Sequence, residues 1–355
     1  MTRIEKLRAK LGEGFSAALV EHSANRWYLS EFSSSAGTLI ITEDDALFIA
    51  DFRYIEAAQK TVTGAKTALQ EPEADRQIGN WLKAKRVGCL MVESEMPLSR
   101  FKKLKTEFED IALIADGGLS DAVLELRSVK EQKELEAVKS AQAITDAAFS
   151  FICGFIKPGL SEREIVAELE YFMRKNGADA LAFDSIVVSG PNSSMPHGVP
   201  GDRKIRAGDF ITMDYGAKKD GYCSDMTRTV AVGFATDEMR RVYDVVHTAH
   251  LTAREHARAG MSGRELDKVA RDVIYGAGYE GHFGHGLGHS LGLEIHERPR
   301  ASPLFDQELV ENVIMTIEPG VYLPGRFGVR IENMVLLKAG SNENLTGSPT
   351  ELIVL

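Results

Sequence analysis

Two segments of the sequence resemble one another at an offset of 101 residues, and this internal repeat limits the folds open to the chain. PGLSEREIVAELEYFMRKNGAD begins at Pro158, and AGMSGRELDKVARDVIYGAGYE begins at Ala259. Each contains a glycine turn, a Ser-x-x-Glu capping box, a helix and a closing glycine. Each also follows a helix-like stretch and precedes strand-like sequence. The repeat therefore predicts an α+β domain with an internal pseudo-two-fold, in which two helix pairs flank a sheet.

The first third of the chain has a different pattern, in which short apolar stretches alternate with helical periodicity. The expected elements are strands at 16–20, 38–42, 46–50 and 89–93 and helices at 3–11, 54–62 and 98–108. This alternation predicts a small α/β domain over residues 1–126. A long amphipathic helix expected at 130–153 then opens a second domain, residues 127–355.

Composition excludes several classes of protein. With 355 residues, 44% hydrophobic and 26% charged, the chain is typical of a globular protein with two domains. The net charge of −10 argues against a nucleic-acid partner. No apolar run approaches the roughly 20 residues that span a bilayer, and the N-terminal stretch lacks the apolar centre of a signal peptide. We therefore expect a cytoplasmic protein without a membrane partner.

Four acidic residues occur in pairs within strand-like sequence. FITMDYG and YCSDMTRTV form a hairpin around the turn in AKKDG, which brings Asp214 and Asp225 to neighbouring positions on paired strands. Downstream, Glu318 and Glu332 are symmetric about the turn LPGRFG, so they too oppose one another. Like charges that face each other across strands destabilise a sheet. A positive group is therefore expected between them.

Two kinds of positive group are open at this point. Arg228 and Arg330 allow a buried ion network, although each is within three residues of an acid in the sequence and is therefore expected beside the site. Divalent cations are the other possibility, and they would need further ligands. The glycine-rich segment GHFGHGLGHSLGLEIHE supplies imidazoles, and its glycines argue against a helix and hence against a zincin-type histidine pair. Its histidines are His282, His285, His289 and His296.

Metal binding explains the charge balance of this site. Four carboxylates with one imidazole form a hard oxygen and nitrogen set suited to Mn²⁺, Co²⁺, Fe²⁺ or Zn²⁺, and four negative charges balance two dications. Bridging acids would hold the two ions roughly 3.5–4 Å apart and share a water that is acidified to a hydroxide nucleophile at neutral pH.

The same motifs resemble a known family. DYG, GYCSDMTRT, GHSLGLEIHE, TIEPGVY and GVRIEN are similar to the metal site of the pita-bread metallopeptidases that act on Xaa-Pro bonds, the prolidases and aminopeptidase P. The resemblance covers essentially the whole chain, because that family also has a smaller α/β, creatinase-like domain before a pseudo-symmetric catalytic domain. It implies hydrolysis of the peptide bond that precedes proline, two divalent ions per subunit, with Mn²⁺ or Co²⁺ ahead of Zn²⁺ or Fe²⁺, and a homodimer.

The resemblance also implies a role for each ligand. Asp214 would ligate one ion, Asp225 and Glu332 would bridge, and His289 and Glu318 would hold the other. Glu318 would also act as the general base for the bridging water.

Further residues are implied at the substrate. His197, in SSMPHGVP, and His296 match histidines that stabilise the tetrahedral intermediate, and His285 matches one near the proline pocket; packing beside the site is the alternative for all three. Arg300 resembles the prolidase arginine that pairs with the free carboxylate of a dipeptide, the alternative being a solvated charge. Arg330 completes the expected substrate-binding set.

The sequence is compatible with both dipeptides and longer peptides as substrates. Prolidases often bring a histidine from the N-terminal domain of the partner subunit to the site, whereas the comparable loop here, EFSSSAG at 31–37, has serines. This difference leaves room for aminopeptidase P activity on longer peptides.

Three other functions belong to the same fold. A catalytically silent pita-bread binding module and a metal-free, creatinase-like hydrolase are both disfavoured by the five retained ligands. Methionine aminopeptidase shares the ligands but usually lacks an α/β domain like residues 1–126.

Overall fold

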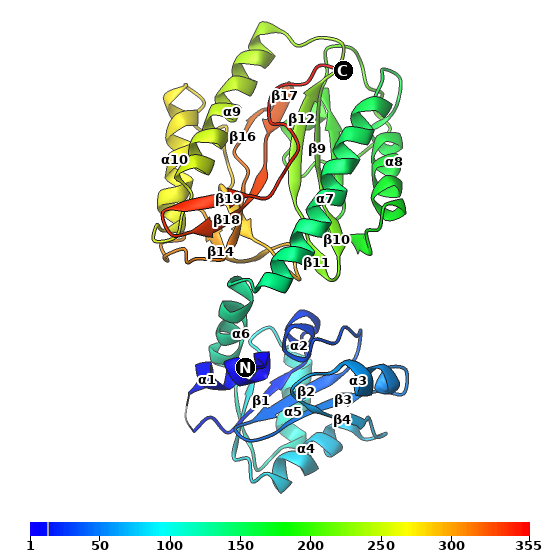
Figure 1. Cartoon of the computed structure of the whole chain (residues 1–355), viewed down its shortest axis with the longest axis vertical. Helices are drawn as coiled ribbons and strands as arrows, with labels where there is room; N and C mark the ends of the chain where they lie inside the picture. The colour runs from blue at the N-terminus through cyan, green and yellow to red at the C-terminus, as the bar shows by residue number, and fades with distance from the viewer. Residues whose placement is uncertain (13) are drawn as a thin grey trace. The chain divides into compact units, whose positions relative to one another are not determined.

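The computed structural model describes residues 1–12 and 14–355, which form two compact units, Met1–Arg127 and Ser128–Leu355 (Figure 1). One hydrophobic core of the first unit includes Leu19, Ile40 and Leu90. The second unit has two cores, one for each half of the repeat.

A mixed six-stranded sheet organises the first unit, in the order β4-β3-β2-β1-β5-β6. Its strands are β1 (Ala17–Val20), β2 (Thr38–Thr42), β3 (Ala46–Ala50), β4 (Lys66–Leu69), β5 (Cys89–Val92) and β6 (Ala112–Ile114). Its helices are α1 (Arg3–Leu11), α2 (Ser23–Ser30), α3 (Ile55–Thr61), α4 (Ala74–Ala84), α5 (Leu98–Glu107) and α6 (Gly118–Ser128).

Every strand and helix expected in this unit is present, with ends that differ by one residue at most. The sequence patterns missed α2, α4, α6, β4 and β6. α2 begins without a side-chain cap, so it lacks the usual start signal. β4 lies at the sheet edge, and none of its four residues is buried, so it lacks the apolar pattern by which strands are recognised.

The second unit places helices on two sides of its strands (Figure 1). The helices are α7 (Gln132–Phe155), α8 (Glu162–Lys175), α9 (Asp237–His256), α10 (Gly263–Gly276) and the short 3-10 helix η1 (Gly190–Ser194). The strands of the first half are β7 (Ala180–Leu181), β8 (Ile186–Ser189), β9 (Phe210–Tyr215), β10 (Ala217–Lys219), β11 (Tyr222–Cys223) and β12 (Met226–Ala231). Those of the second half are β13 (Gly288–Ser290), β14 (Glu297–Ala301), β15 (Ile314–Ile317), β16 (Gly320–Leu323), β17 (Phe327–Arg330), β18 (Asn333–Lys338) and β19 (Ser341–Asn344).

The repeated capping boxes form as the sequence predicts. The hydroxyls of Ser161 and Ser262 accept from the backbone N–H groups of Glu164 and Glu265, and each glutamate side chain accepts from the N–H of its serine. A glycine with positive φ follows both helices. α8 packs against α7 and α10 against α9, so two helix pairs flank the strands.

We predict that Ser262→Ala lowers the free energy of unfolding by about 1 kcal/mol, because the first turn of α10 loses the acceptor for one backbone N–H. Chemical denaturation followed by far-ultraviolet circular dichroism measures this change. Ser262→Thr is the matched control, since it keeps the hydroxyl. Equal losses in the two variants would contradict the capping role.

Candidate metal centre

The first acid pair lies where β9 meets the start of β12. Asp214 on β9 is directly opposite Thr227, and Asp225 immediately precedes β12. Because side chains alternate between the faces of a strand, Asp225 and Thr227 share a face, and the two acids are diagonal neighbours on it. β10 and β11 continue the hairpin to a turn at Asp220 and Gly221, both of which have positive φ. That turn is the one expected from the sequence.

The second acid pair lies between two short antiparallel ladders. Ile317 of β15 pairs with Asn333 of β18. The next residues inward, Glu318 and Glu332, therefore lie across from one another, as the symmetry about the turn predicts.

β13 carries the imidazole of the site. His289 lies opposite Arg300 of β14, and its backbone N–H donates to the hydroxyl of Thr316 at 3.0 Å. A Cβ at Gly288 would lie 2.0 Å from the carbonyl oxygen of Thr316, so only glycine allows β13 to approach β15 this closely. The segment is a strand here, in agreement with the expectation that it is not helical.

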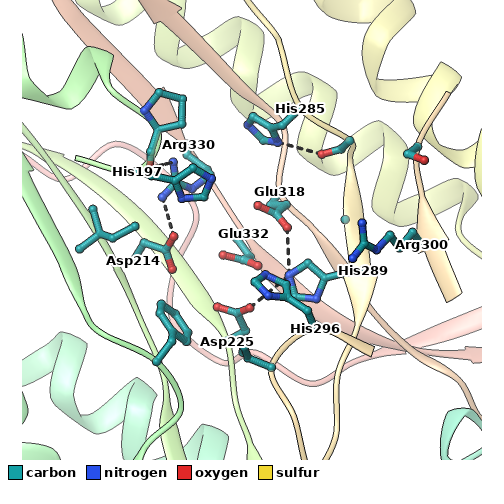
Figure 2. Close-up of a pocket in the computed structure, with 17 residues that line it drawn as sticks. His197, Asp214, Asp225, His285, His289, His296, Arg300, Glu318, Arg330 and Glu332 are labelled. Carbon is teal, nitrogen blue, oxygen red and sulfur yellow. Dashed lines mark hydrogen bonds and ion pairs between the residues drawn. The ribbon is translucent and has the colours of Figure 1, made fainter. Parts of the chain in front are cut away.

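These side chains converge on one cavity of about 440 Å³ (Figure 2). Nε2 of His289 lies 3.6 Å from Oδ2 of Asp225 and 3.4 Å from Oε1 of Glu318. One ligand atom from each of Asp225, His289 and Glu332 lies within 4.8 Å of the other two. The five strands that carry or adjoin these residues thus bring together acids that are more than 100 positions apart in the sequence.

The electrostatics of this cluster favour a cation. Burial, together with the neighbouring carboxylates, raises the pKa of Asp225 and of Glu332 well above their usual values. Burial likewise raises the pKa of Glu318 to about 8 and lowers the pKa of His289 to about 4. A protein without a cation must therefore keep protons on acids and leave the imidazole neutral.

Arg330 neutralises one of the four acids. Its Nη2 donates to Oδ2 of Asp214 at 2.6 Å, and its Nη1 donates to the hydroxyl of Tyr322 at 2.9 Å. Burial opposes the charge of this guanidinium, but Tyr322, Asp214 and Glu318 outweigh it and hold the pKa of Arg330 well above its usual value. Arg330 thus lies inside the site rather than beside it.

Arg228 forms no hydrogen bond or ion pair with the side chain of any of the four acids. Its guanidinium is buried and donates to backbone carbonyls, including those of Ser348 and Pro349, and to the side chain of Asn333. Within residues 1–12 and 14–355, no lysine or arginine bonds to the side chain of Asp225, Glu318 or Glu332. The ion network considered from the sequence therefore consists of one direct ion pair, Arg330 with Asp214, and the charge of Arg330 acts on Glu318 and Glu332 only without a hydrogen bond.

Two carboxylate oxygens are left without a donor, and this supports a metal. Oδ1 of Asp214 and Oε1 of Glu332 are buried and have no hydrogen-bond partner in the described part of the chain. The second oxygen of each is already fixed, by Arg330 and by the hydroxyl of Thr227 respectively. Buried oxygens with unused lone pairs, in a site that also contains a neutral imidazole, suit a hard divalent cation, so these residues fit the metal ions expected from the sequence.

The histidines expected at the substrate line the same cavity. The ring of His296 lies 4.5 Å from that of His289, and Nε2 of His285 forms a hydrogen bond with the hydroxyl of Tyr322 at 2.9 Å. Burial lowers the pKa of His285 to about 4. His197 and Arg300 also line the cavity, and Figure 2 shows Arg300 at the side of His289.

Three further polar residues of the site are not among those expected from the sequence. Tyr322 links Arg330 to His285 through its hydroxyl, and Thr227 and Thr316 donate to Glu332 and Glu318 at 2.7 and 3.1 Å. Each threonine is two residues from an acid of the site, which places both on one strand face and is the signal that could have identified them. Tyr322 has no such signal, because its role depends on residues from two other segments.

Apolar side chains form the rest of the cavity wall. Phe183, Ile186, Pro196 and Ile295 line it beside the charged groups. An apolar wall with a few fixed polar groups is typical of sites that bind small organic ligands or peptides.

The metal-free protein is predicted to lose stability as the pH rises from 7.5 to 9. In this window the lowered pKa values of His250, His285, His289 and His296 contribute little slope, because these imidazoles are neutral in the folded state and about nine-tenths neutral in the unfolded state. Glu318, in contrast, keeps its proton only in the folded state, so the folded state binds more protons than the unfolded state and stability falls. One such group contributes up to about 1.4 kcal/mol per pH unit.

Urea denaturation of chelator-treated protein at pH 7.5 and 9 measures this effect. Glu318→Gln is the control and should show a smaller loss over the same interval. A rise in stability over the interval, or an unchanged slope in the variant, would contradict the assignment.

Comparisons with known proteins identify the family. Residues 136–339 match metallopeptidase family M24, and residues 3–129 match the creatinase/prolidase N-terminal domain. The structure of an Xaa-Pro dipeptidase from Bacillus anthracis is 40% identical, with 99% of each chain covered and a TM-score of 0.96. That of an X-Pro aminopeptidase from Thermotoga maritima is 37% identical, with 99% of this chain and 100% of that chain covered and a TM-score of 0.91. An Xaa-Pro dipeptidase from Pyrococcus horikoshii is 35% identical over 345 residues, which are 95% of this chain and 94% of that protein.

The chain therefore belongs to metallopeptidase family M24. The predicted fold class is confirmed: an α+β pita-bread domain with an internal pseudo-two-fold follows a smaller α/β, creatinase-like domain. Membership of a metallopeptidase family implies divalent metal ions. Among the described helices, none has the length and apolar character needed to cross a membrane.

Proposed function

We propose that this protein hydrolyses the peptide bond preceding proline with the help of two divalent metal ions. The observation that carries the proposal is the group of mostly buried carboxylates and a neutral imidazole that share one cavity. Among the described residues, no lysine or arginine bonds to the side chains of three of these acids. Relatives whose names specify Xaa-Pro or X-Pro cleavage span nearly all of this chain, which supports the substrate class.

Five residues would hold the ions. Asp214 would bind one ion through Oδ1, Asp225 and Glu332 would lie between the two, and His289 and Glu318 would bind the other. This hard donor set favours Mn²⁺ or Co²⁺, with Zn²⁺ or Fe²⁺ as alternatives. When bound, the ions supply Lewis acidity toward the scissile carbonyl and acidify a water nucleophile.

The residues around the metal ligands would handle protons and charge. Glu318, whose carboxylate is oriented by the hydroxyl of Thr316, accepts the proton of the attacking water and returns it to the leaving nitrogen of proline. His197 and His296 donate hydrogen bonds to the oxygen of the tetrahedral intermediate. His285, fixed by Tyr322, lies at the proline side of the cavity, and Arg330 fixes the orientation of Asp214.

Arg300 supports a dipeptide as the preferred substrate. It is exposed, lines the cavity, and its guanidinium has no hydrogen-bond or ion-pair partner within the described residues. Since it lies opposite His289 in the β13–β14 ladder, it is positioned to bind the free carboxylate of a short peptide. The serines of the 31–37 loop, and the similarity to an X-Pro aminopeptidase, make cleavage of longer peptides the second candidate.

Parallel turnover of Ala-Pro and Ala-Pro-Ala by the Mn²⁺-loaded protein tests the function. We predict that Ala-Pro is cleaved with the higher kcat/KM, and that Arg300→Leu raises KM for Ala-Pro by about 10–100-fold, the equivalent of one charge-assisted hydrogen bond. KM for Ala-Pro-Ala should change little in that variant.

Asp225→Asn is the control and should be inactive on both peptides. Absence of cleavage of any Xaa-Pro peptide by the Mn²⁺- or Co²⁺-loaded protein would overturn the proposed function. Preferred cleavage of the tripeptide would instead identify an aminopeptidase and would exclude Arg300 as the residue that binds the free carboxylate of a dipeptide.

Several further expectations accompany this proposal. We propose domain limits at 1–126 and 127–355. The expected binding partner is a peptide rather than a nucleic acid or a membrane, and the expected location is the cytoplasm. A homodimer is also expected, and light scattering should give the mass of two chains rather than one.

A further inference from the structure

The two halves of the repeat begin their second helices in the same way. The start of α8 pairs with an extended segment after it, through Ser161 and Lys204, and the start of α10 does so through Ser262 and Glu308. The next backbone N–H in each half, that of Glu162 or Gly263, donates to a carbonyl of the same segment. Glu162 and Gly263 are therefore equivalent positions.

A residue of the cavity lies shortly before each extended segment in the sequence. In the first half, His197 precedes the segment, and in the second half Arg300 does. The equivalent positions 162 and 263 thus lie next to the two chain segments whose side chains, His197 and Arg300, are expected at the substrate.

Glu162 binds both ends of the segment that carries His197. Its side chain is fully buried, and its carboxylate accepts from the N–H and the hydroxyl of Ser189, both at 2.7 Å, and from the N–H of Gly201 at 3.0 Å. The amide of Asn192 donates to it as well, at 3.1 Å. One carboxylate therefore closes the loop 189–201 on itself.

Gly263 achieves the corresponding contact without a side chain. A Cβ at this position would lie 2.1 Å from the carbonyl oxygen of Arg300 and 2.9 Å from the ring of Phe305. Backbone thus fills, in the second half, the volume that the Glu162 side chain fills in the first. The pseudo-two-fold symmetry is broken at this position. The side chain of Glu162 holds the loop that carries His197, whereas Gly263 lets the backbone of Arg300 approach closely.

Two other contacts hold the 189–201 loop at its start and middle. Gly190, with φ of 49°, packs on the ion pair of Arg203 and Asp209, where a Cβ would lie 2.4 Å from Nη2 of Arg203. Arg330 donates to the carbonyl of Pro196 at 3.3 Å. His197 itself is exposed and makes no hydrogen bond within the described residues, so its position depends on these backbone anchors.

We propose that Glu162 is a positioning residue that holds His197 at the reacting carbonyl, an inference that rests on the proposed function. A carboxylate can satisfy four donors at once, because all of its lone pairs accept. Glutamine has nearly the same size, but its NH₂ group is a donor and cannot accept from the donors that one carboxylate oxygen now binds. One end of the loop would therefore lose its hydrogen bonds. Glu162 forms no hydrogen bond with any of the five expected metal ligands, so its effect should reach the cavity through the loop that carries His197.

A double-mutant cycle separates this role from general destabilisation. Glu162→Gln should lower kcat for Ala-Pro by about 10–100-fold, the range typical of residues that orient a functional side chain, while KM changes less than about threefold. In a His197→Ala background the same substitution should lower kcat less than about threefold. Equal losses in both backgrounds would overturn the proposal.

Glu164→Gln is the matched control, since it removes a carboxylate from the same helical turn. Glu164 caps α8 by accepting from Ser161 and pairs with Lys204, but it does not touch the 189–201 loop. This variant should melt at a lower temperature and keep kcat within about twofold of the parent.

Hydrogen exchange of the metal-free protein gives a readout that needs no activity. Amides of residues 189–201 should exchange at least about tenfold faster in Glu162→Gln, whereas those of β12 should not change. Unchanged exchange in the loop would overturn the positioning role even if no peptide is cleaved. Faster exchange without turnover in the parent protein would instead refute the proposed function and leave Glu162 as the anchor of this loop.

Discussion

Repulsion among buried carboxylates is the constraint on which the rest of this structure depends. Asp225, Glu318 and Glu332 lie around one cavity, and no lysine or arginine among the described residues bonds to their side chains. Burial disfavours their charged forms, and the charge of Arg330 offsets this only in part for Glu318 and Glu332. The protein tolerates this arrangement because rigid strands hold each acid and threonine hydroxyls orient two of them. The missing positive charge is the reason that we assign the site to metal ions.

The pseudo-two-fold explains how one cavity receives side chains from distant parts of the sequence. The first half supplies Asp214 and Asp225 from a hairpin, and the second half supplies Glu318 and Glu332 from the corresponding place. Symmetry alone would make the two halves chemically alike, but the halves differ where substrate is expected. The first half supplies His197 and the second half supplies Arg300. Glu162 and Gly263 occupy equivalent positions, and each contacts the segment that carries one of these two residues.

Much of this architecture is readable from local patterns. Capping boxes, turn residues and the symmetry of the acids about their turns placed α8, α10 and both acid pairs, because each depends on residues close together in the sequence. Arg330 was expected beside the acids and lies among them, since its direction depends on Tyr322 and Asp214, which come from other strands. Arg228 has the same residue type and a comparable strand setting, yet it binds the C-terminal segment. Local sequence does not encode which of two arginines meets which partner.

The most direct test of the metal assignment is anomalous X-ray diffraction from crystals of the Mn²⁺-loaded protein. The account predicts two anomalous peaks roughly 3.5–4 Å apart, the spacing of bridged two-metal sites. Both peaks should lie in the cavity, with Asp225 and Glu332 between them, Asp214 at one and His289 and Glu318 at the other. A single peak, or peaks bound by residues outside this set, would contradict the account.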